Sequence, residues 1–205
     1  MAVNLNHFSP APKFSGVATS ELIRDVALRL FVQHGYQSVS LRQIAEEVGI
    51  NAGSLYHHIE SKAELLYELV ERYELTLTDE VLPPPGKRNS AVADMLRYVR
   101  SYITHVTANT ELACLSQREF CCLSADQKKV ILTTQKKNTE YLIETLQAGS
   151  RKDQFKIADI QLAAQSVLAI LDRVAINPTN RGASTETITR HIQCIVLKAI
   201  GASNS

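Results

Sequence analysis

The sequence predicts an all-α protein with a small N-terminal helical unit and a larger C-terminal helical body. Apolar residues recur at helical spacing through most of the 205 residues, whereas alternating runs typical of strands are scarce. Glycine and proline are also scarce, with 8 and 6 residues, which argues against a loop-rich or disordered chain. Apolar residue types make up 45% of the chain, enough to bury a substantial core.

The first helix is predicted to follow a flexible arm. Residues 1–18 are rich in proline and small polar residues and poor in apolar ones, so we interpret them as the arm. From about Thr19 the pattern becomes that of an amphipathic helix, and Gly35 ends it. Its apolar face consists of Leu22, Ile23, Val26, Ala27, Leu30 and Phe31.

Three further helices are predicted within the next fifty residues. Ser40 begins the second helix with a capping box that Gln43 completes, and Gly49 ends it. A third, short helix covers about residues 52–58. The fourth begins after Ser61 and continues to about residue 82, where a run of prolines ends it. We therefore predict one compact unit over residues 19–64 and a helical body over residues 65–205.

The C-terminal body is predicted to contain four more long helices. They cover about residues 90–108, 125–149, 158–176 and 185–200. Ser124 with Gln127 forms another capping box, the pair Asn177-Pro178 ends the third of these helices, and Ser184 caps the last. Residues 110–123 remain ambiguous and could hold one short helix.

The segment from Ser40 to Lys62 has the pattern of a helix-turn-helix. A helix that ends at Gly49, a turn through Ile50 and Asn51, and a short second helix follow one another. Small side chains on the outer face of the second helix would let its backbone enter the major groove of DNA, which is roughly 12 Å wide. The residues left to face outward are Ala52, Gly53, Ser54, Tyr56 and His57.

Residues 27–66, "ALRLFVQHGYQSVSLRQIAEEVGINAGSLYHHIESKAELL", resemble the TetR/AcrR family of transcriptional regulators. In the family pattern, the first helix ends in Phe and is followed by Gly-Tyr or Gly-Phe. A second helix that begins with Ser or Thr contains Ile-Ala and ends in Gly-Val or Gly-Ile. The recognition helix carries "LYxHF" and precedes the Lys of "SK". Ile59 departs from it, because Phe is usual there. The matching residues are Phe31, Gly35, Tyr36, Ser40, Ile44, Ala45, Gly49, Ile50, Leu55, Tyr56, His57, His58, Ser61 and Lys62.

The resemblance implies roles in binding double-stranded operator DNA. Arg42 would reach a base edge, where its guanidinium suits guanine. Ser54 and His57 would face bases or phosphates, and Tyr56 and Lys62 would contact phosphates. Residues 1–62 nevertheless carry five basic and five acidic side chains, and the whole chain has a net charge of +1. Affinity would thus depend on placed contacts more than on bulk charge.

The resemblance also implies a homodimer and an effector. Dimerisation would use the last two long helices, through Ala163, Ala164, Val167, Leu168 and Leu171 on one and Ile188, Ile192, Ile195, Val196 and Ala199 on the other. A small hydrophobic or acyl-type molecule in the C-terminal body would shift the fourth helix and release a repressor from a palindromic operator. The candidate effector contacts are Tyr98, Tyr102, His105, Phe120, Tyr141, Leu168 and Asp172.

Within the family, two stretches of sequence narrow the effector class. The segment "AGSLYHHIESKAELL" together with "QREF" at residues 117–120 resembles members that govern lipid, acyl-CoA or aromatic-compound breakdown. An alternative is a DNA-binding protein of the same fold that takes no small molecule and responds to a protein partner or acts architecturally. The dimer helices could also simply close the core of their own chain.

Other functional classes find little support in the sequence. We find no Ser/His/Asp grouping, paired carboxylates, phosphate-binding glycine loop or Cys/His metal spacing, so we expect no enzyme, catalytic residue, metal or cofactor. A helical interaction module would require the helix-turn-helix pattern to be accidental. No signal peptide or membrane span is predicted, which favours the cytoplasm and no membrane partner. Cys114, Cys121, Cys122 and Cys194 are expected to be reduced, with a redox or metal role left open.

Overall fold

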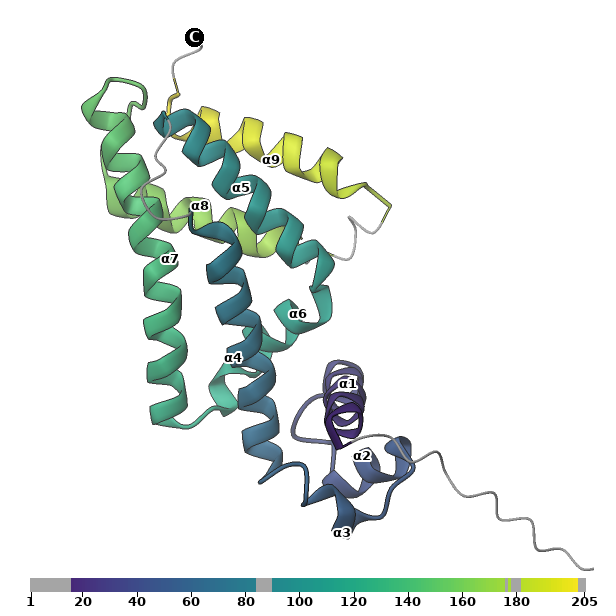
Figure 1. The fold of residues 1–205 in the computed structure, drawn as a ribbon. Helices are drawn as coiled ribbons and strands as arrows, with labels where there is room; N and C mark the ends of the chain where they lie inside the picture. Colours follow the sequence, from purple (N-terminus) through teal and green to yellow (C-terminus); the bar gives the residue numbers. More distant parts are fainter. Residues whose placement is uncertain (1–15, 84–89, 176, 178–181, 203–205) are drawn as a thin grey trace, which may run out of the picture. The chain divides into compact units, whose positions relative to one another are not determined.

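The computed structural model describes residues 16–83, 90–175, 177 and 182–202. The described residues form helices and no strand, which confirms the all-α class (Figure 1). The first helix, α1 (Gly16–His34), begins three residues before the predicted start at Thr19. The rest of the predicted arm, residues 1–15, lies outside the described residues.

The chain divides into two units, with the boundary between Leu66 and Tyr67. The first unit contains α1, α2 (Leu41–Val48), α3 (Ala52–Leu55) and the first turn of α4 (Lys62–Val81). The remainder of α4 belongs to the second unit, so one helix contributes to both. The second unit continues with α5 (Ala91–Ala108), α6 (Thr110–Glu119), the 3-10 helix η1 (Phe120–Cys122), α7 (Ala125–Arg151), α8 (Ile160–Ala175) and α9 (Thr185–Ala199).

Local hydrogen bonds explain where the helices of the first unit begin and end. Gly35 follows α1 with φ +82°, a backbone conformation that residues with a Cβ rarely adopt. Ser40 accepts the Gln43 N–H at 3.2 Å, while the Gln43 side chain accepts the Ser40 N–H at 2.8 Å, so the predicted capping box is present. The core of this first unit is built from Ile23, Val26, Ala27, Leu30, Phe31, Tyr36, Val39, Ile44, Ala45, Leu55, Ile59, Leu65 and Leu66.

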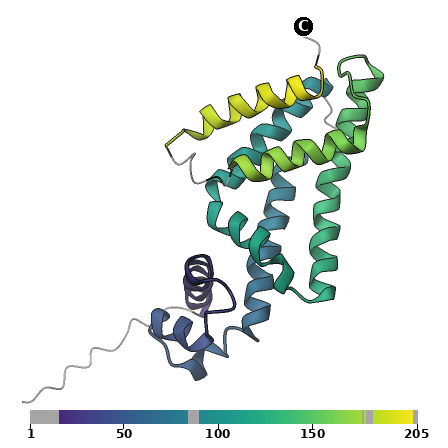
Figure 2. The same ribbon diagram turned by 180° about the vertical axis from the view of Figure 1, so that it is seen from behind.

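Helix α5 is central to the second unit because it contacts α6, α7, α8 and α9. Helices α8 and α9 also contact each other, and both views show them beside α5 (Figures 1 and 2). Ser124 and Gln127 form the predicted capping box of α7, and the Ser184 hydroxyl accepts the Thr187 N–H at the start of α9. The ambiguous residues 110–123 contain both α6 and η1. Pro178 lies outside the described residues.

The faces predicted for dimerisation lie mostly inside their own chain. Those buried in or packed against the core are Ala163, Ala164, Val167, Leu168, Leu171, Ile188, Ile192 and Val196. Only Ile195 and Ala199 of the predicted set are exposed. Leu162, which was not predicted, is 62% exposed on α8. Any contact between copies through these helices would therefore use their outward sides.

No described helix is both long and apolar enough to cross a membrane. All four cysteines are free thiols, and the Sγ atoms of Cys121 and Cys122 lie 3.9 Å apart. Over the described part of the chain, no three His, Cys, Asp or Glu side chains cluster closely enough to hold a metal ion.

Candidate functional site

The turn between α2 and α3 depends on a glycine. Gly49 has φ +79°, and the following N–H groups of Gly49 and Ile50 donate to the carbonyls of Glu46 and Ala45 at 3.1 and 3.0 Å. This arrangement satisfies the last carbonyls of α2 and reverses the chain direction. Asn51 then begins α3 by accepting the Ser54 N–H at 2.7 Å. The two helices therefore form a tight helix-turn-helix.

The burial of Leu55 determines which residues of α3 face outward. Leu55 is fully buried in the core of the first unit. Its neighbours Ala52, Gly53 and His57 are exposed, and Tyr56 is 60% exposed. An exposed tyrosine offers both an apolar ring and a hydroxyl group to a partner. The outer face of α3 thus combines small side chains with one projecting aromatic group.

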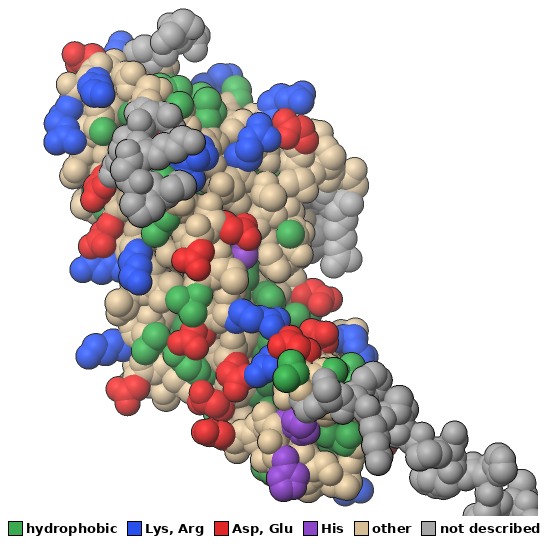
Figure 3. All heavy atoms as spheres, viewed as in Figure 1, with side chains coloured by type: hydrophobic (Ala, Val, Ile, Leu, Met, Phe, Trp, Pro, Cys, Tyr) green, Lys and Arg blue, Asp and Glu red, His purple; other side chains and the backbone are tan. Residues whose placement is uncertain are grey.

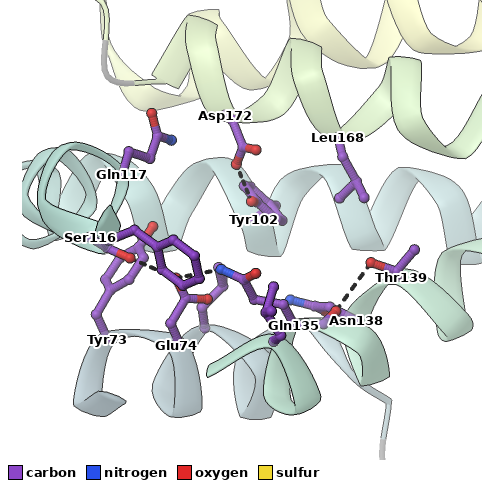
Figure 4. A pocket seen from close by; sticks show the side chains of 13 residues that line it. Tyr73, Glu74, Tyr102, Ser116, Gln117, Gln135, Asn138, Thr139, Leu168 and Asp172 are labelled. Carbon is purple, nitrogen blue, oxygen red and sulfur yellow. Dashed lines mark hydrogen bonds between the residues drawn. The ribbon is translucent and has the colours of Figure 1, made fainter. Parts of the chain in front are cut away.

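The second unit contains a cavity of about 340 Å³ beneath α5 and α8 (Figure 4). Its wall is mainly polar and aromatic, and the residues come from α4, α5, α6, η1, α7 and α8. The lining residues are Tyr73, Glu74, Leu77, Tyr102, Ser116, Gln117, Phe120, Leu132, Gln135, Asn138, Thr139, Leu168 and Asp172.

Two carboxyl groups face this cavity. Glu74 accepts hydrogen bonds from Ser116 Oγ at 2.7 Å and from Gln135 Nε2 at 3.0 Å, and Asp172 accepts one from the Tyr102 hydroxyl. Burial raises the pKa of Asp172, although the Tyr102 bond opposes the shift. Burial also raises the pKa of Glu74; its two hydrogen bonds lower it and the charge of Asp172 adds to the rise.

Comparison with known proteins identifies the helix-turn-helix. The model of bacterial regulatory proteins of the tetR family matches residues 23–69. The chain is 36% identical over 92 residues to the HTH-type transcriptional regulator AcrR of Shigella flexneri, a segment that covers 45% of this chain and 41% of that protein. It is 26% identical over 204 residues to the HTH-type transcriptional repressor KstR2 of Rhodococcus jostii, covering 96% of this chain and 98% of that protein.

Solved structures agree in fold. A tetR-family regulatory protein from Rhodococcus RHA1 superposes with a TM-score of 0.84 at 21% identity, covering 91% of this chain and 98% of that one. AibR in complex with isovaleryl coenzyme A and operator DNA superposes with a TM-score of 0.78 at 21% identity, covering 90% and 100%. The chain belongs to the TetR/AcrR family of transcriptional regulators. The resemblance of residues 27–66 is thereby confirmed.

The residues of this TetR-family regulator that were predicted to contact DNA differ in the exposure of their side chains. Arg42 is exposed on α2, whereas Ser54 is half-buried on α3. His58, which the sequence left outside the contact set, is half-buried and lies 3.1 Å from Ser20 Oγ through its Nδ1 atom. This contact joins the end of α3 to α1, so His58 has a structural partner within the unit.

Lys62 has a role that the sequence did not indicate. Its ammonium group donates to the carbonyls of Val39 at 2.7 Å, Tyr36 at 3.1 Å and Gln37 at 3.4 Å. It also lies 4.5 Å from the centroid of the Tyr36 ring. These contacts hold the loop between α1 and α2 against the start of α4. The predicted phosphate contact would compete with them.

Most basic groups of the regulator's first unit already have partners. Arg24 pairs with Glu21 at 3.3 Å and Arg29 with Glu47 at 2.8 Å. Among the Lys and Arg side chains of residues 16–66, only Arg42 has no hydrogen bond or ion pair in the described structure. On the face in Figure 3, acidic and basic side chains are interspersed over the surface. Specific contacts therefore matter more than a basic field.

The cavity brings together four of the seven predicted effector residues. Tyr102, Phe120, Leu168 and Asp172 line it, whereas Tyr98, His105 and Tyr141 do not. Each of the latter three has another environment. Tyr98 is fully buried between the rings of Tyr102 and Tyr141, at 6.0 and 5.9 Å.

The other two residues that do not line the cavity have polar partners elsewhere. The Tyr141 hydroxyl accepts a hydrogen bond from Arg97 at 2.9 Å. His105 packs 5.3 Å from Tyr73 and its Nδ1 atom lies 3.0 Å from the Glu80 carboxylate. Both side chains are buried and are held in place within the second unit.

Sequence reasoning missed most polar residues of the cavity wall. Glu74 follows Tyr73 within the apolar stripe of α4, and a carboxylate in such a stripe could have marked it. Gln135, Asn138 and Thr139 share one face of α7 at the spacing i, i+3 and i+4. The sequence shows this spacing, but not that the same face meets α4 and α8.

Proposed function

We propose that this TetR-family transcriptional regulator binds a palindromic operator as a homodimer and acts as a repressor that a small molecule releases from DNA. The observation that carries the proposal is the exposed outer face of α3, together with the exposed Arg42 on α2. Small exposed residues there permit close approach to a groove, and Arg42 is the one Lys or Arg side chain of residues 16–66 without a described partner.

Within this proposal, some exposed residues read the base sequence of the operator, and others fix the position of the protein on the DNA. Arg42 donates two hydrogen bonds to the O6 and N7 atoms of a guanine. The Tyr56 hydroxyl binds a phosphate, which fixes the register without reading sequence. Ala52 and Gly53 allow the backbone to approach, while Ser54 and His57 contact bases or phosphates beside them.

The effector enters the cavity of the second unit. Tyr73, Glu74 and Leu77 of the cavity wall lie on α4, and the first turn of the same helix supplies Leu65 and Leu66 to the core of the first unit. A ligand that moves the middle of α4 thus acts on a helix whose beginning is part of the DNA-binding unit. Such a ligand shifts the equilibrium only by its differential affinity for the two positions of α4.

Relatives support a ligand-controlled regulator without defining this ligand. KstR2 of Rhodococcus jostii is named a repressor, and AibR is described in complex with isovaleryl coenzyme A and operator DNA. For the present chain, the cavity supports a small-molecule effector over control by a protein partner, because it is large enough for a small ligand and has polar anchors.

The deciding experiment measures binding of the purified full-length protein to the DNA upstream of its own gene, with random duplex as competitor at moderate salt. We expect a clear preference for the upstream DNA. Arg42→Ala is expected to lose about 1–3 kcal/mol of that preference while retaining binding to random DNA, and Tyr56→Ala to weaken both about equally.

The matched control is Arg151→Ala, which removes one exposed positive charge from the end of α7 in the second unit. It is expected to leave the preference unchanged. If Arg42→Ala weakened specific and random DNA equally, Arg42 would not be a base reader. If the unmodified protein bound without preference, an architectural role would replace the proposed one, provided that other intergenic segments gave the same result.

A further inference from the structure

The cavity of the second unit is lined by acidic side chains and by no basic side chain. None of its thirteen lining residues is Lys, Arg or His, while Glu74 and Asp172 both contribute carboxyl groups. The hydrogen bonds that these groups accept come from neutral donors, namely Ser116, Gln135 and Tyr102. Their negative charges are therefore solvated locally but not neutralised.

Three cationic side chains on the elements that line the cavity are engaged elsewhere. Arg97 donates to the Val81 carbonyl and the Tyr141 hydroxyl at 2.8 and 2.9 Å. Lys128 donates to the Cys121 carbonyl at 2.8 Å, and Arg118 lies 2.9 Å from the Glu119 carboxylate. Each of these three side chains would have to leave a partner to pair with a cavity carboxylate, and the exposed Arg173 beside Asp172 does not line the cavity.

An unsatisfied acceptor also faces this site. Asn138 lines the cavity and is only 5% exposed, and its Oδ1 atom has no hydrogen-bond partner among the described residues. A buried acceptor without a donor is costly, so it indicates a place for a donor from outside the chain. The rings of Tyr73, Tyr102 and Phe120 form further parts of the wall.

We propose that the effector of this cavity is an organic cation, a protonated amine carried on an apolar or aromatic body. The ammonium group lies between Glu74 and Asp172 and donates to the amide oxygen of Asn138. The body of the ligand contacts the aromatic rings and Leu168, where cation–π and apolar contacts add to the binding. This inference rests on the proposed function, because it specifies the ligand of the same regulator.

The same charges disfavour an anionic effector. The carboxylate of a free acyl chain or the phosphates of an acyl coenzyme A would meet two acidic groups and no base, and like charges at close range destabilise binding. The raised pKa values of Glu74 and Asp172 reflect the cost of burying these charges. A bound cation offsets this cost, and its binding is therefore expected to lower both pKa values.

Three ligands that share one skeleton test the proposal: 4-phenylbutylamine, 4-phenylbutanol and 4-phenylbutyrate, which are cationic, neutral and anionic at pH 7. Their binding to the full-length protein is measured by calorimetry. We expect the amine to bind at least about tenfold tighter than the alcohol, and the butyrate to bind weakest. In the isosteric variants Glu74→Gln and Asp172→Asn, we expect the preference for the amine to fall by about tenfold.

The matched control is Glu144→Gln, which neutralises an exposed carboxylate of α7 away from the cavity and is expected to keep the preference. Circular dichroism checks that each variant is folded. Equal or tighter binding of the butyrate, no binding of the amine, or unchanged preference in both cavity variants would overturn the cation assignment. Operator binding is measured separately on ligand-free protein, so failure of the proposed function is recognised independently.

Discussion

Lys62 concentrates several interactions at one position of the first unit. Its ammonium group donates hydrogen bonds to carbonyls of the loop between α1 and α2, and Lys62 is itself the first residue of α4. Hydrogen bonds with one charged partner contribute more to stability than neutral ones. The same group therefore has a structural role that does not require DNA, and stability measurements can separate the two roles.

We expect Lys62→Ala to lower the free energy of unfolding of the first unit by about 1–3 kcal/mol, because three carbonyls lose a charged donor. Urea unfolding followed by circular dichroism measures this loss. Arg42→Ala is the control, since it also removes one positive charge but no described contact, and it should change stability by less than about 0.5 kcal/mol. Unchanged stability in Lys62→Ala, with weaker binding to all DNA, would instead support the phosphate contact.

The two cavity carboxyl groups make the ligand-free protein sensitive to pH. Their folded-state pKa values are raised, so their contribution favours folding below the ordinary carboxyl pKa and is lost as pH increases through the raised values. We expect Glu74→Gln and Asp172→Asn to match the unmodified protein in melting temperature at acidic pH and to exceed it increasingly toward pH 7. Melting curves at several pH values test this, and a constant difference would contradict it.

At the scale of elements, close packing at the end of α7 fixes the turn that leads toward α8. The Gly149 carbonyl accepts the N–H groups of Lys152, Gln154 and Phe155 at 3.2, 2.9 and 3.3 Å. The Phe155 ring lies directly on Gly149, and a Cβ built there would be 2.1 Å from a ring carbon. A glycine is required because the ring occupies the space of a side chain.

Gly149→Ala is expected to destabilise the second unit by about 1–3 kcal/mol, since the Phe155 ring must move out of a packed core. Thermal unfolding of the full chain measures the effect. Gly182→Ala provides the comparison, because a Cβ at Gly182 would meet no atom within 4 Å. Similar melting temperatures for both variants would show that Phe155 adapts without cost.

At the scale of the whole molecule, the outward sides of α8 and α9 are the candidates for contact with a second copy. Leu162 is 62% exposed on α8 and Ile195 is 38% exposed on α9, while most of the apolar residues predicted for this contact lie in the chain's own core. A two-fold dimer uses the same patch on both copies and places two α3 helices on successive turns of DNA, about 34 Å apart.

We expect the double variant Leu162→Glu with Ile195→Glu to shift the protein from dimer to monomer and to reduce operator affinity, because charges replace exposed apolar side chains at the contact. Light scattering coupled to size-exclusion chromatography measures the mass. Val130→Glu is the control, since Val130 is 44% exposed on α7 and should not affect the mass. A double variant that remained dimeric would exclude this surface as the dimer contact.

Local information was sufficient for most helices and for the helix-turn-helix, although α3 ends at Leu55 and not near the predicted residue 58. Capping boxes at Ser40 and Ser124 and the left-handed glycines Gly35 and Gly49 involve atoms only a few residues apart, so the sequence alone predicts them. The aligned residues of the resemblance lie in the same local segment. Helical periodicity similarly predicted α5, α7, α8 and α9 with small errors at their ends.

Only the tertiary structure decided which side chains share an environment. Glu74 and Asp172 are 98 positions apart in sequence numbering, yet both line one cavity. Tyr98 and Tyr102 are one helical turn apart, yet only Tyr102 lines it. Periodicity identifies an inward face but not which part of that face meets another helix or leaves a space. The cavity, its charge and the role of Lys62 depend on contacts between distant segments, which no local pattern encodes.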